Sequence, residues 1–179
     1  MAIIFELWIE CENRKQAEKH ISHFDGLAFT LLSGLEISWK SGIDAMCPET
    51  PGVEVWSSEL SSFGVRDVQD AIDITECGIR LYHHLLSAPE FQFAYTAFNP
   101  NVCVAELGDY FSRSPDGYRS CQFSCVLNDE LAQKFAPLRF FQPFRPGYLW
   151  REYLGEDYRP LGSNDHPELS RLKRQLLSA

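Results

Sequence analysis

Two pairs of side chains have the residue types and spacing of metal ligands. Cys121 and Cys125 are candidate zinc ligands, but four residues of a strand span roughly 13 Å, whereas a zinc–sulfur bond is about 2.3 Å long. His20 and His23 lie three residues apart on a predicted helix and can face the same way. The sequence shows no third ligand for them, and zinc sites need at least three protein ligands. We therefore predict no metal and no cofactor.

Nucleophilic catalysis would need a thiol or hydroxyl beside a general base. Cys77 and His84 are a candidate pair by residue type, but they lie seven residues apart. That separation is two helical turns, or roughly 10 Å. The chain also lacks the motifs G-x-S-x-G, G-x-G-x-x-G, H-E-x-x-H and the phosphate-binding P-loop. We therefore predict no catalytic residue, and binding is favoured over catalysis.

Acidic and aromatic residues alternate along two predicted strands, at residues 2–11 and 53–58. On the first strand, every second residue from Ile3 to Ile9 is apolar and predicts a buried side. The other side, together with the second strand, carries Glu6, Trp8, Glu10, Glu54 and Trp56. Two indoles among three carboxylates can hold a cation, a sugar or a basic protein. The alternative is that the last eighty residues cover these side chains, because an open sheet would expose two tryptophans to water.

The stretch RFFQPFRPGYLWR, residues 139–151, combines five aromatic rings with three arginines. Its arginines have the charge that an acidic face attracts, and Arg151 completes the predicted binding site. Pro143 and Pro146 predict that residues 142–146 stay out of regular strand pairing. We predict that the segment folds back and docks on the protein's own sheet, over the acidic face. Stacking of nucleic-acid bases between the arginines is the alternative, which the net charge of −9 disfavours.

The elements that must position these residues read strand, helix, strand, strand, helix, strand over the first hundred residues. The predicted strands are 2–11, 27–32, 53–58 and 91–97, with a further short strand at 35–39, a loop at 41–52, and helices at 13–24 and 67–87. This order resembles the split βαβ, or ferredoxin-like, unit. It implies an α+β fold with an antiparallel sheet and both helices on one face.

The remaining residues predict an extension of that core. Strands are expected at 102–107, 118–127 and 147–154, a short helix at 129–136, and a terminal helix at about 167–177. No linker or repeat interrupts the chain. We therefore predict a single domain over residues 1–179, with a core at 1–98 and a C-terminal extension, 99–179, packed on it.

Composition and charge narrow the class of partner. Hydrophobic residues make up 45% and charged residues 23%, as in ordinary globular proteins. Residues 1–129 hold 8 Lys and Arg against 19 Asp and Glu, a net charge of −11, whereas residues 130–179 have a net charge of +2. The net negative charge of residues 1–129 disfavours nonspecific binding to nucleic acid. The chain contains no apolar run of membrane-spanning length, and its six cysteines show no disulfide-scaffold spacing. We expect a cytoplasmic protein with reduced thiols that does not act at a membrane.

These patterns favour a non-catalytic acidic binding protein, of the adaptor, inhibitor or immunity type, that recognises a protein with a basic patch. The predicted binding residues are Glu6, Trp8, Glu10, Glu54, Trp56 and Arg151. One alternative is a small-molecule-binding protein or enzyme with a pocket between the sheet and the C-terminal segment. A homodimer formed through a sheet edge or an aromatic patch is a third hypothesis.

Overall fold

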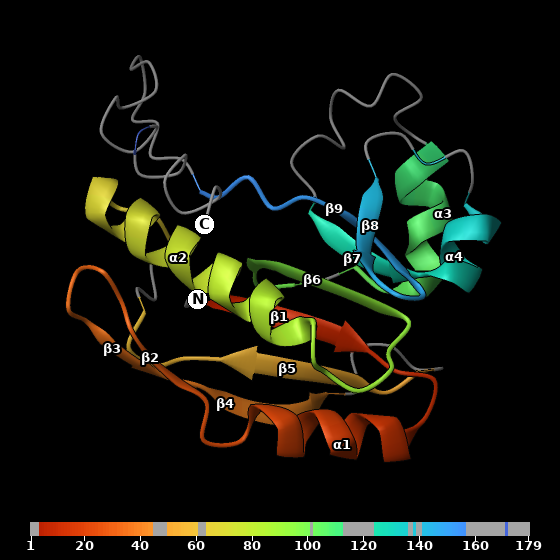
Figure 1. Cartoon of the computed structure of the whole chain (residues 1–179), viewed down its shortest axis with the longest axis horizontal. Coiled ribbons are helices and arrows are strands. Elements are labelled where there is room, and N and C mark those ends of the chain that lie inside the picture. The colour runs from red at the N-terminus through yellow and green to blue at the C-terminus, as the bar shows by residue number, and fades with distance from the viewer. Residues whose placement is uncertain are drawn as a thin grey trace.

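The structure is a computed structural model of the chain (Figure 1). It describes residues 4–44, 50–60, 64–100, 102–112, 124–135, 138, 141–156 and 171. In chain order the elements are β1 (Phe5–Glu10), α1 (Arg14–Phe24), β2 (Ala28–Thr30), β3 (Glu36–Ser38), β4 (Lys40–Asp44), β5 (Gly52–Trp56), α2 (Val68–Leu85), β6 (Phe93–Phe98), α3 (Val104–Ser112), β7 (Cys125–Asn128), α4 (Asp129–Lys134), β8 (Gln142–Arg145) and β9 (Tyr148–Arg151). The predicted α+β class is confirmed.

Seven of the strands form one sheet in the order β4-β5-β1-β6-β7-β9-β8, and β2 and β3 form a separate hairpin. Every strand pairing in the described part of the chain is antiparallel. The first four strands of this order come from the first hundred residues. The last three extend the sheet beyond β6, so the C-terminal part of the chain adds strands to the sheet as well as packing on it.

The two long helices begin and end where the sequence predicts. The Asn13 side chain accepts a hydrogen bond from the backbone N–H of Gln16 and caps α1. Asp67 caps α2 in the same way by accepting from the N–H of Asp70. The chain leaves α1 through Gly26, whose φ of 71° lies in the left-handed region that glycine tolerates.

Helices cover both faces of the sheet. One core joins α1 and α2 to the side of β1 that carries Phe5, Leu7 and Ile9. A second core lies on the opposite side of the sheet, where Trp8 packs with Leu107 of α3 and with residues of α4. The predicted buried side of β1 is confirmed, but the expectation of helices on one face holds only for α1 and α2.

Two segments have a different secondary structure from the one expected. The predicted loop 41–52 contains β4, which hydrogen-bonds to β5 along five residue pairs even though Ser41 and Gly42 have low strand propensity. The predicted strand 102–107 lies largely within α3. The buried Glu10 carboxylate accepts the N–H of Val104 at 2.8 Å, which satisfies a donor in the first turn of that helix.

The proline-containing stretch at 142–146 is also more regular than predicted. Residues Gln142–Arg145 form the edge strand β8, which pairs with β9 through a bulge between Pro143 and Arg145. An edge position tolerates proline because the missing N–H has no partner to lose on its outer side. The predicted short helix after residue 129 and the strand at 147–154 are confirmed as α4 and β9, whereas the predicted terminal helix falls almost wholly outside the described residues.

Among the described cysteines, Cys103 differs from expectation. Cys11, Cys77 and Cys125 are buried free thiols, which pack as small apolar side chains. Cys103 forms a disulfide, so the prediction that every cysteine is reduced is wrong. Among the described residues, no helix combines the length and the apolar character needed to cross a membrane.

Candidate functional site

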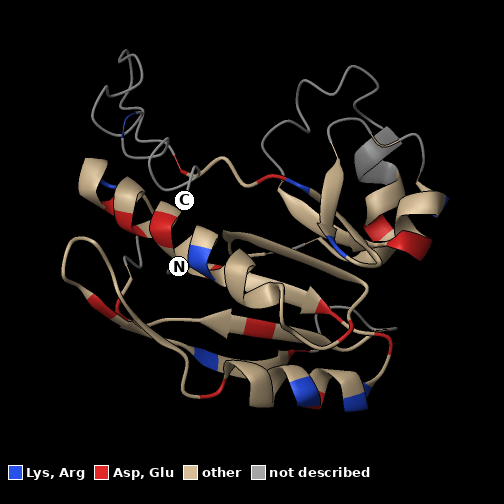
Figure 2. Cartoon of the chain, viewed as in Figure 1, with Lys and Arg blue, Asp and Glu red and all other residues tan. Residues whose placement is uncertain are grey.

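Strand pairing brings most of the predicted binding residues to one side of the sheet. Glu6 of β1 pairs with Trp56 of β5, and Trp8 pairs with Glu54. Residues directly opposite each other in an antiparallel pair share a face. We call the side that carries Glu6, Trp8, Glu10, Glu54, Trp56 and Arg151 the acid–aromatic face; Figure 2 shows acidic positions on β1 and β5 and a basic position on β4.

Two of these residues are part of the protein's own core. Trp8 is fully buried, and its indole lies over Gly52, where an added Cβ would come within 1.8 Å of the Trp8 Cη2 atom. Glu10 is 1% exposed and accepts hydrogen bonds from Val104 N–H and from the Thr50 hydroxyl. Trp8 and Glu10 therefore hold β5 and α3 on the sheet, and their side chains are not available to a partner.

The accessible part of the acid–aromatic face is a group of three carboxylates, which we call the carboxylate cluster: Glu6, Asp44 and Glu54. All three are half-buried. Burial, a hydrogen bond with Asp44 and the charges of Glu6 and Asp44 raise the pKa of Glu54 to about 7. Burial and the charge of Asp44 also raise the pKa of Glu6. At neutral pH the cluster therefore holds negative charge that its surroundings disfavour.

Aromatic and basic side chains flank the carboxylate cluster. Trp56 pairs with Glu6 on one side and with the exposed Lys40 on the other. The half-buried Trp56 ring lies close to Gly42, where an added Cβ would be 3.3 Å from Cη2. Asp44 and Lys40 were missed by the sequence analysis because they fall in or beside the predicted loop, and only the pairing of β4 with β5 reveals them.

Arg151 lies on the same side of the sheet but away from the cluster. It pairs with Cys125 of β7, and β9 is three strands from β1 in the sheet order. Strands are spaced about 4.8 Å apart, so roughly 14 Å separates its strand from β1. Burial raises the pKa of the Cys125 thiol, and the Arg151 charge opposes that rise. The structure therefore does not bring Arg151 to the carboxylate cluster.

Arg145 anchors the segment predicted at residues 139–151 to the end of α2. Its guanidinium donates hydrogen bonds to the carbonyls of four residues at the end of α2 and just beyond: Leu85, Leu86, Ala88 and Pro89. Its Cζ atom also lies 5.1 Å from the ring centroid of Phe91 and 4.3 Å from that of Tyr148. A cation at a helix C-terminus meets the negative end of the helix dipole. The segment folds back on the protein as predicted, but the acceptors of Arg145 are carbonyls and not the acidic face.

Three histidines of α1 and α2 lie near this contact: His20 is buried, and His23 and His84 are half-buried. His20 is fully buried, its Nε2 lies 3.1 Å from the Glu90 carbonyl, and burial lowers its pKa to about 4. His23 and His84 each place Nε2 near the other's carbonyl, at 3.3 and 3.1 Å. Together with Phe91, Arg145 and Tyr148 they form what we call the histidine–arginine cluster. His20 is buried because α1 packs directly on the segment before β6.

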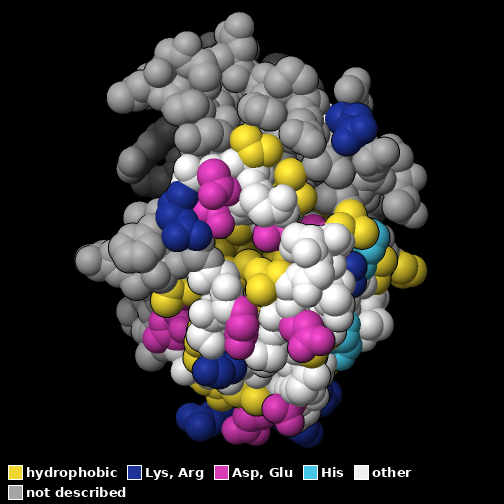
Figure 3. All heavy atoms as spheres, turned by 90° about the vertical axis from the view of Figure 1, so that its left-hand side faces the viewer, with side chains coloured by type: hydrophobic (Ala, Val, Ile, Leu, Met, Phe, Trp, Pro, Cys, Tyr) yellow, Lys and Arg dark blue, Asp and Glu magenta, His cyan; other side chains and the backbone are white. Residues whose placement is uncertain are grey.

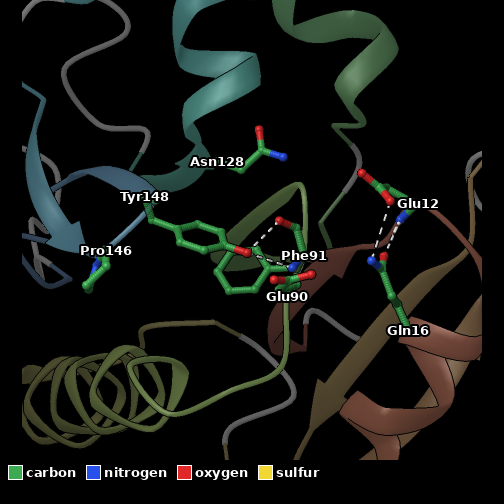
Figure 4. A pocket seen from close by; sticks show the side chains of 8 residues that line it. Glu12, Gln16, Glu90, Phe91, Asn128, Pro146 and Tyr148 are labelled. Carbon is green, nitrogen blue, oxygen red and sulfur yellow. Dashed lines mark hydrogen bonds between the residues drawn. The ribbon is translucent and has the colours of Figure 1, made fainter.

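A pocket lies between the body of the protein and the β8–β9 hairpin (Figure 4). Its volume is about 220 Å³, and it is lined by Glu12, Gln16, Glu90, Phe91, Asn128, Pro146, Gly147 and Tyr148. The Tyr148 hydroxyl accepts from Phe91 N–H and donates to its carbonyl, which fixes the pocket floor. The predicted pocket between the sheet and the C-terminal segment has a counterpart here, but none of the predicted residues lines it.

A second hollow lies beside the β2–β3 hairpin. It has a volume of about 420 Å³ and is lined by Ala28, Phe29, Thr30, Glu36, Ile37, Ser38 and Glu59. Figure 3 shows hydrophobic side chains at the floor of a depression on this side of the molecule, with acidic side chains around it. Glu76 joins the hairpin to α2, because it accepts the Leu32 N–H and pairs with Arg80.

The described residues contain no group of three histidine, cysteine or acidic side chains arranged to hold a metal ion. Carboxylates beside an indole, as in the acid–aromatic face, are groups that can hold a cation. No protein family, curated protein or solved structure matches this chain. The function must therefore be argued from the geometry of the acid–aromatic face.

Proposed function

We propose that this protein is a non-catalytic binding protein that recognises a basic patch on a partner protein through Glu6, Asp44, Glu54 and Trp56. The observation that carries the proposal is the raised pKa of Glu54, about 7, beside two further carboxylates. A lysine or arginine placed among them would relieve their mutual repulsion, so the cluster gains more from a cation than three isolated carboxylates would. The half-buried Trp56 ring supplies an aromatic surface for the same cation.

The strand order supports a more specific fold for the first hundred residues. We propose that β1, α1, β4, β5, α2 and β6 form a ferredoxin-like unit, with the β2–β3 hairpin inserted after α1. The order β4-β5-β1-β6, antiparallel throughout and with α1 and α2 in one core, is consistent with it. One core holds both Phe5 and Tyr148, which supports the prediction of a single domain.

The cytoplasmic location remains a prediction. The disulfide of Cys103 argues against it, because disulfides persist mainly in oxidising compartments. Labelling of free thiols in protein taken from its native cells, with and without prior reduction, would decide between the two. Three labelled buried thiols plus a labelled Cys103 before reduction would support the cytoplasmic prediction.

The binding proposal is tested with a fluorescently labelled octa-arginine peptide, whose anisotropy reports complex formation. We expect binding that weakens as salt rises, together with a change in tryptophan emission from Trp56. The double variant Glu6→Gln/Glu54→Gln should bind at least ~10-fold more weakly, because it removes two of the three charges that attract the peptide. The variant Trp56→Ser should lose affinity without a change in net charge.

A matched control separates the carboxylate cluster from the general acidity of the chain. Glu36→Gln/Glu152→Gln changes the net charge by the same amount at two exposed positions on β3 and after β9. We expect this control to alter affinity less than about twofold, since exposed charges at a distance are screened. Equal losses in both double variants, or no peptide binding at low salt, would contradict the proposal.

The pocket beside the β8–β9 hairpin favours a second candidate function, the binding of a small ligand. Glu12, Glu90 and Asn128 place acidic and amide groups around the aromatic pair Phe91 and Tyr148 (Figure 4). Such a lining suits a small amine. Methylamine and larger amines, followed by the chemical shifts of the Asn128 side-chain amide, would test it. Shifts that are confined to the pocket and abolished by Glu90→Gln are the expected result.

A further inference from the structure

The two edges of the seven-stranded sheet are built differently. The β8 edge carries Pro143 and a bulge between Pro143 and Arg145. Both features block the addition of another strand. The β4 edge, residues Lys40–Asp44, contains no proline and pairs in unbroken register with β5. In the described part of the chain its outer side has no neighbouring strand. One edge is therefore closed to strand addition and the other is suited to it.

Contacts to α1 keep the β4 edge ordered. The Ser41 hydroxyl donates to the Ile21 carbonyl at 3.4 Å, and α1 packs on β4 and β5. Ile43, which is 37% exposed, is one of the few large apolar side chains on the surface. A strand that is already ordered loses less conformational entropy on pairing than a mobile segment would.

The charges of β4 are complementary to those of a second, antiparallel β4. In a pairing centred on Gly42, Lys40 of one copy lies opposite Asp44 of the other, and Asp44 lies opposite Lys40. Residues directly opposite share a face, so each lysine enters the carboxylate cluster of the other copy. On the opposite face Ser41 and Ile43 meet, which covers the exposed Ile43 side chain.

We propose that two copies of this chain associate through antiparallel pairing of their β4 strands about Gly42, forming one continuous sheet. The proposal commits to a second copy as the occupant because the strand's charge pattern is self-complementary, with a basic and an acidic residue at equal distances from its centre. Opposite charges at facing positions attract, whereas like charges there repel. The pairing requires no other protein. It places Lys40 of one copy beside Asp44 of the other, so a second copy and a basic partner would compete for the carboxylate cluster.

The pairing has a consequence for the acid–aromatic face. A two-fold axis through Gly42 keeps the faces of the two sheets on the same side, so two copies of Trp56 and Glu54 would lie on one surface. A five-residue strand pairing buries little area, so we expect a weak dimer in the micromolar range.

Sedimentation velocity of the full chain over a range of concentrations tests the proposal. We expect a concentration-dependent shift from 20.5 kDa towards twice that mass. Lys40→Asp and Asp44→Lys place like charges opposite each other, and each should weaken dimerisation at least ~10-fold. The double variant Lys40→Asp/Asp44→Lys restores opposite charges at both positions and should return the wild-type dimer. Lys15→Asp, a charge reversal on the exposed side of α1, should leave dimerisation unchanged.

Hydrogen exchange provides a second readout of the same pairing. Amides of residues 40–44 should become more protected as the wild-type concentration rises, whereas in Lys40→Asp they should not. A wild-type chain that stays monomeric at high micromolar concentration would overturn the proposal. So would a dimer that both single variants leave intact, or a double variant no better than either single one. The octa-arginine experiment reads the acidic face without reference to mass, so the failure of one proposal leaves the other standing.

Discussion

The carboxylate cluster and the histidine–arginine cluster lie on opposite faces of the sheet. They differ in whether the protein itself supplies groups that stabilise their charge. On the side of α1 and α2, the Arg145 guanidinium donates to four carbonyls and lies near the rings of Phe91 and Tyr148. Its positive charge is matched by acceptors of the protein itself. At β4 and β5, burial and the neighbouring carboxylates of Asp44 and Glu6 raise the pKa of Glu54 to about 7. The first arrangement is complete without a partner, whereas the second becomes more favourable when a cation arrives.

This difference separates structural charges from functional candidates better than residue type does. An arginine among aromatic rings resembles a nucleic-acid site in the sequence, yet Arg145 anchors the β8–β9 hairpin to the end of α2. A carboxylate on a strand attracts little notice, yet Glu54 is held in a state that burial and neighbouring charges disfavour. Perturbed groups in accessible positions are the better guide to binding sites.

The largest effect on stability is expected from removing the hydrogen bonds of Arg145. Arg145→Leu leaves carbonyl acceptors at the end of α2 without their donor, and it should lower the free energy of unfolding by about 3 kcal/mol. Arg145→Lys keeps the charge but loses the planar fork of donors, so an intermediate loss is expected. Arg14→Leu, which breaks an exposed ion pair, should change stability by less than about 0.5 kcal/mol. Urea unfolding of the three variants provides the measurement. A stability loss in Arg145→Leu no larger than in Arg14→Leu would mean that the hairpin is held by other contacts.

Two glycine substitutions should distinguish the buried part of the acid–aromatic face from its accessible part by their effects on stability. An added Cβ at Gly52 would collide with the buried Trp8 ring at 1.8 Å, whereas one at Gly42 would meet the half-buried Trp56 ring at 3.3 Å. Gly52→Ala should destabilise the protein by about 2 kcal/mol, because a packed core cannot shift freely. Gly42→Ala should be nearly neutral because Trp56 has room to move. Thermal unfolding compares the two, and equal losses would show that Trp56 is packed as tightly as Trp8.

The pH dependence of stability should have opposite signs in the two regions. Burial lowers the His20 pKa to about 4, below an ordinary value near 6.5, so the unfolded chain binds the proton more readily. The stability that His20 confers is therefore present above pH 6.5 and is lost as pH falls towards 4. Between pH 7 and pH 5 the wild type should lose about 2 kcal/mol more than His20→Gln, which keeps a donor for the Glu90 carbonyl. The exposed His83 provides the control: His83→Gln should follow the wild-type curve in urea unfolding at each pH.

Features of the two clusters that depend on local sequence pattern were predictable from the sequence. Alternation in β1 identified the side that carries Glu6, Trp8 and Glu10, and both long helices lie where they were predicted, at 13–24 and 67–87. Long-range pairing was not accessible in this way. Asp44 joins the carboxylate cluster only because β4 pairs with β5, and Glu10 is buried only because α3 begins above it. A residue's partner across a sheet depends on register, which local propensity does not determine.

The smallest expected effect concerns Glu54. Its folded-state pKa is raised, so the folded chain binds the proton more readily than the unfolded chain, and stability falls as pH rises from about 4.5 through 7. Glu54→Gln removes this penalty. Because the side chain is only half-buried and solvent screens its charge, the gain at pH 8 should not exceed about 1 kcal/mol, and at pH 5 it should be about a quarter of its value at pH 8. Added salt should shrink the gain further, while Glu36→Gln should show no such pH dependence.

Urea unfolding at the two pH values measures the difference. A variant less stable than wild type at pH 8 would mean that the Glu54 carboxylate already has a cation beside it, and the reason for proposing a basic partner would be lost.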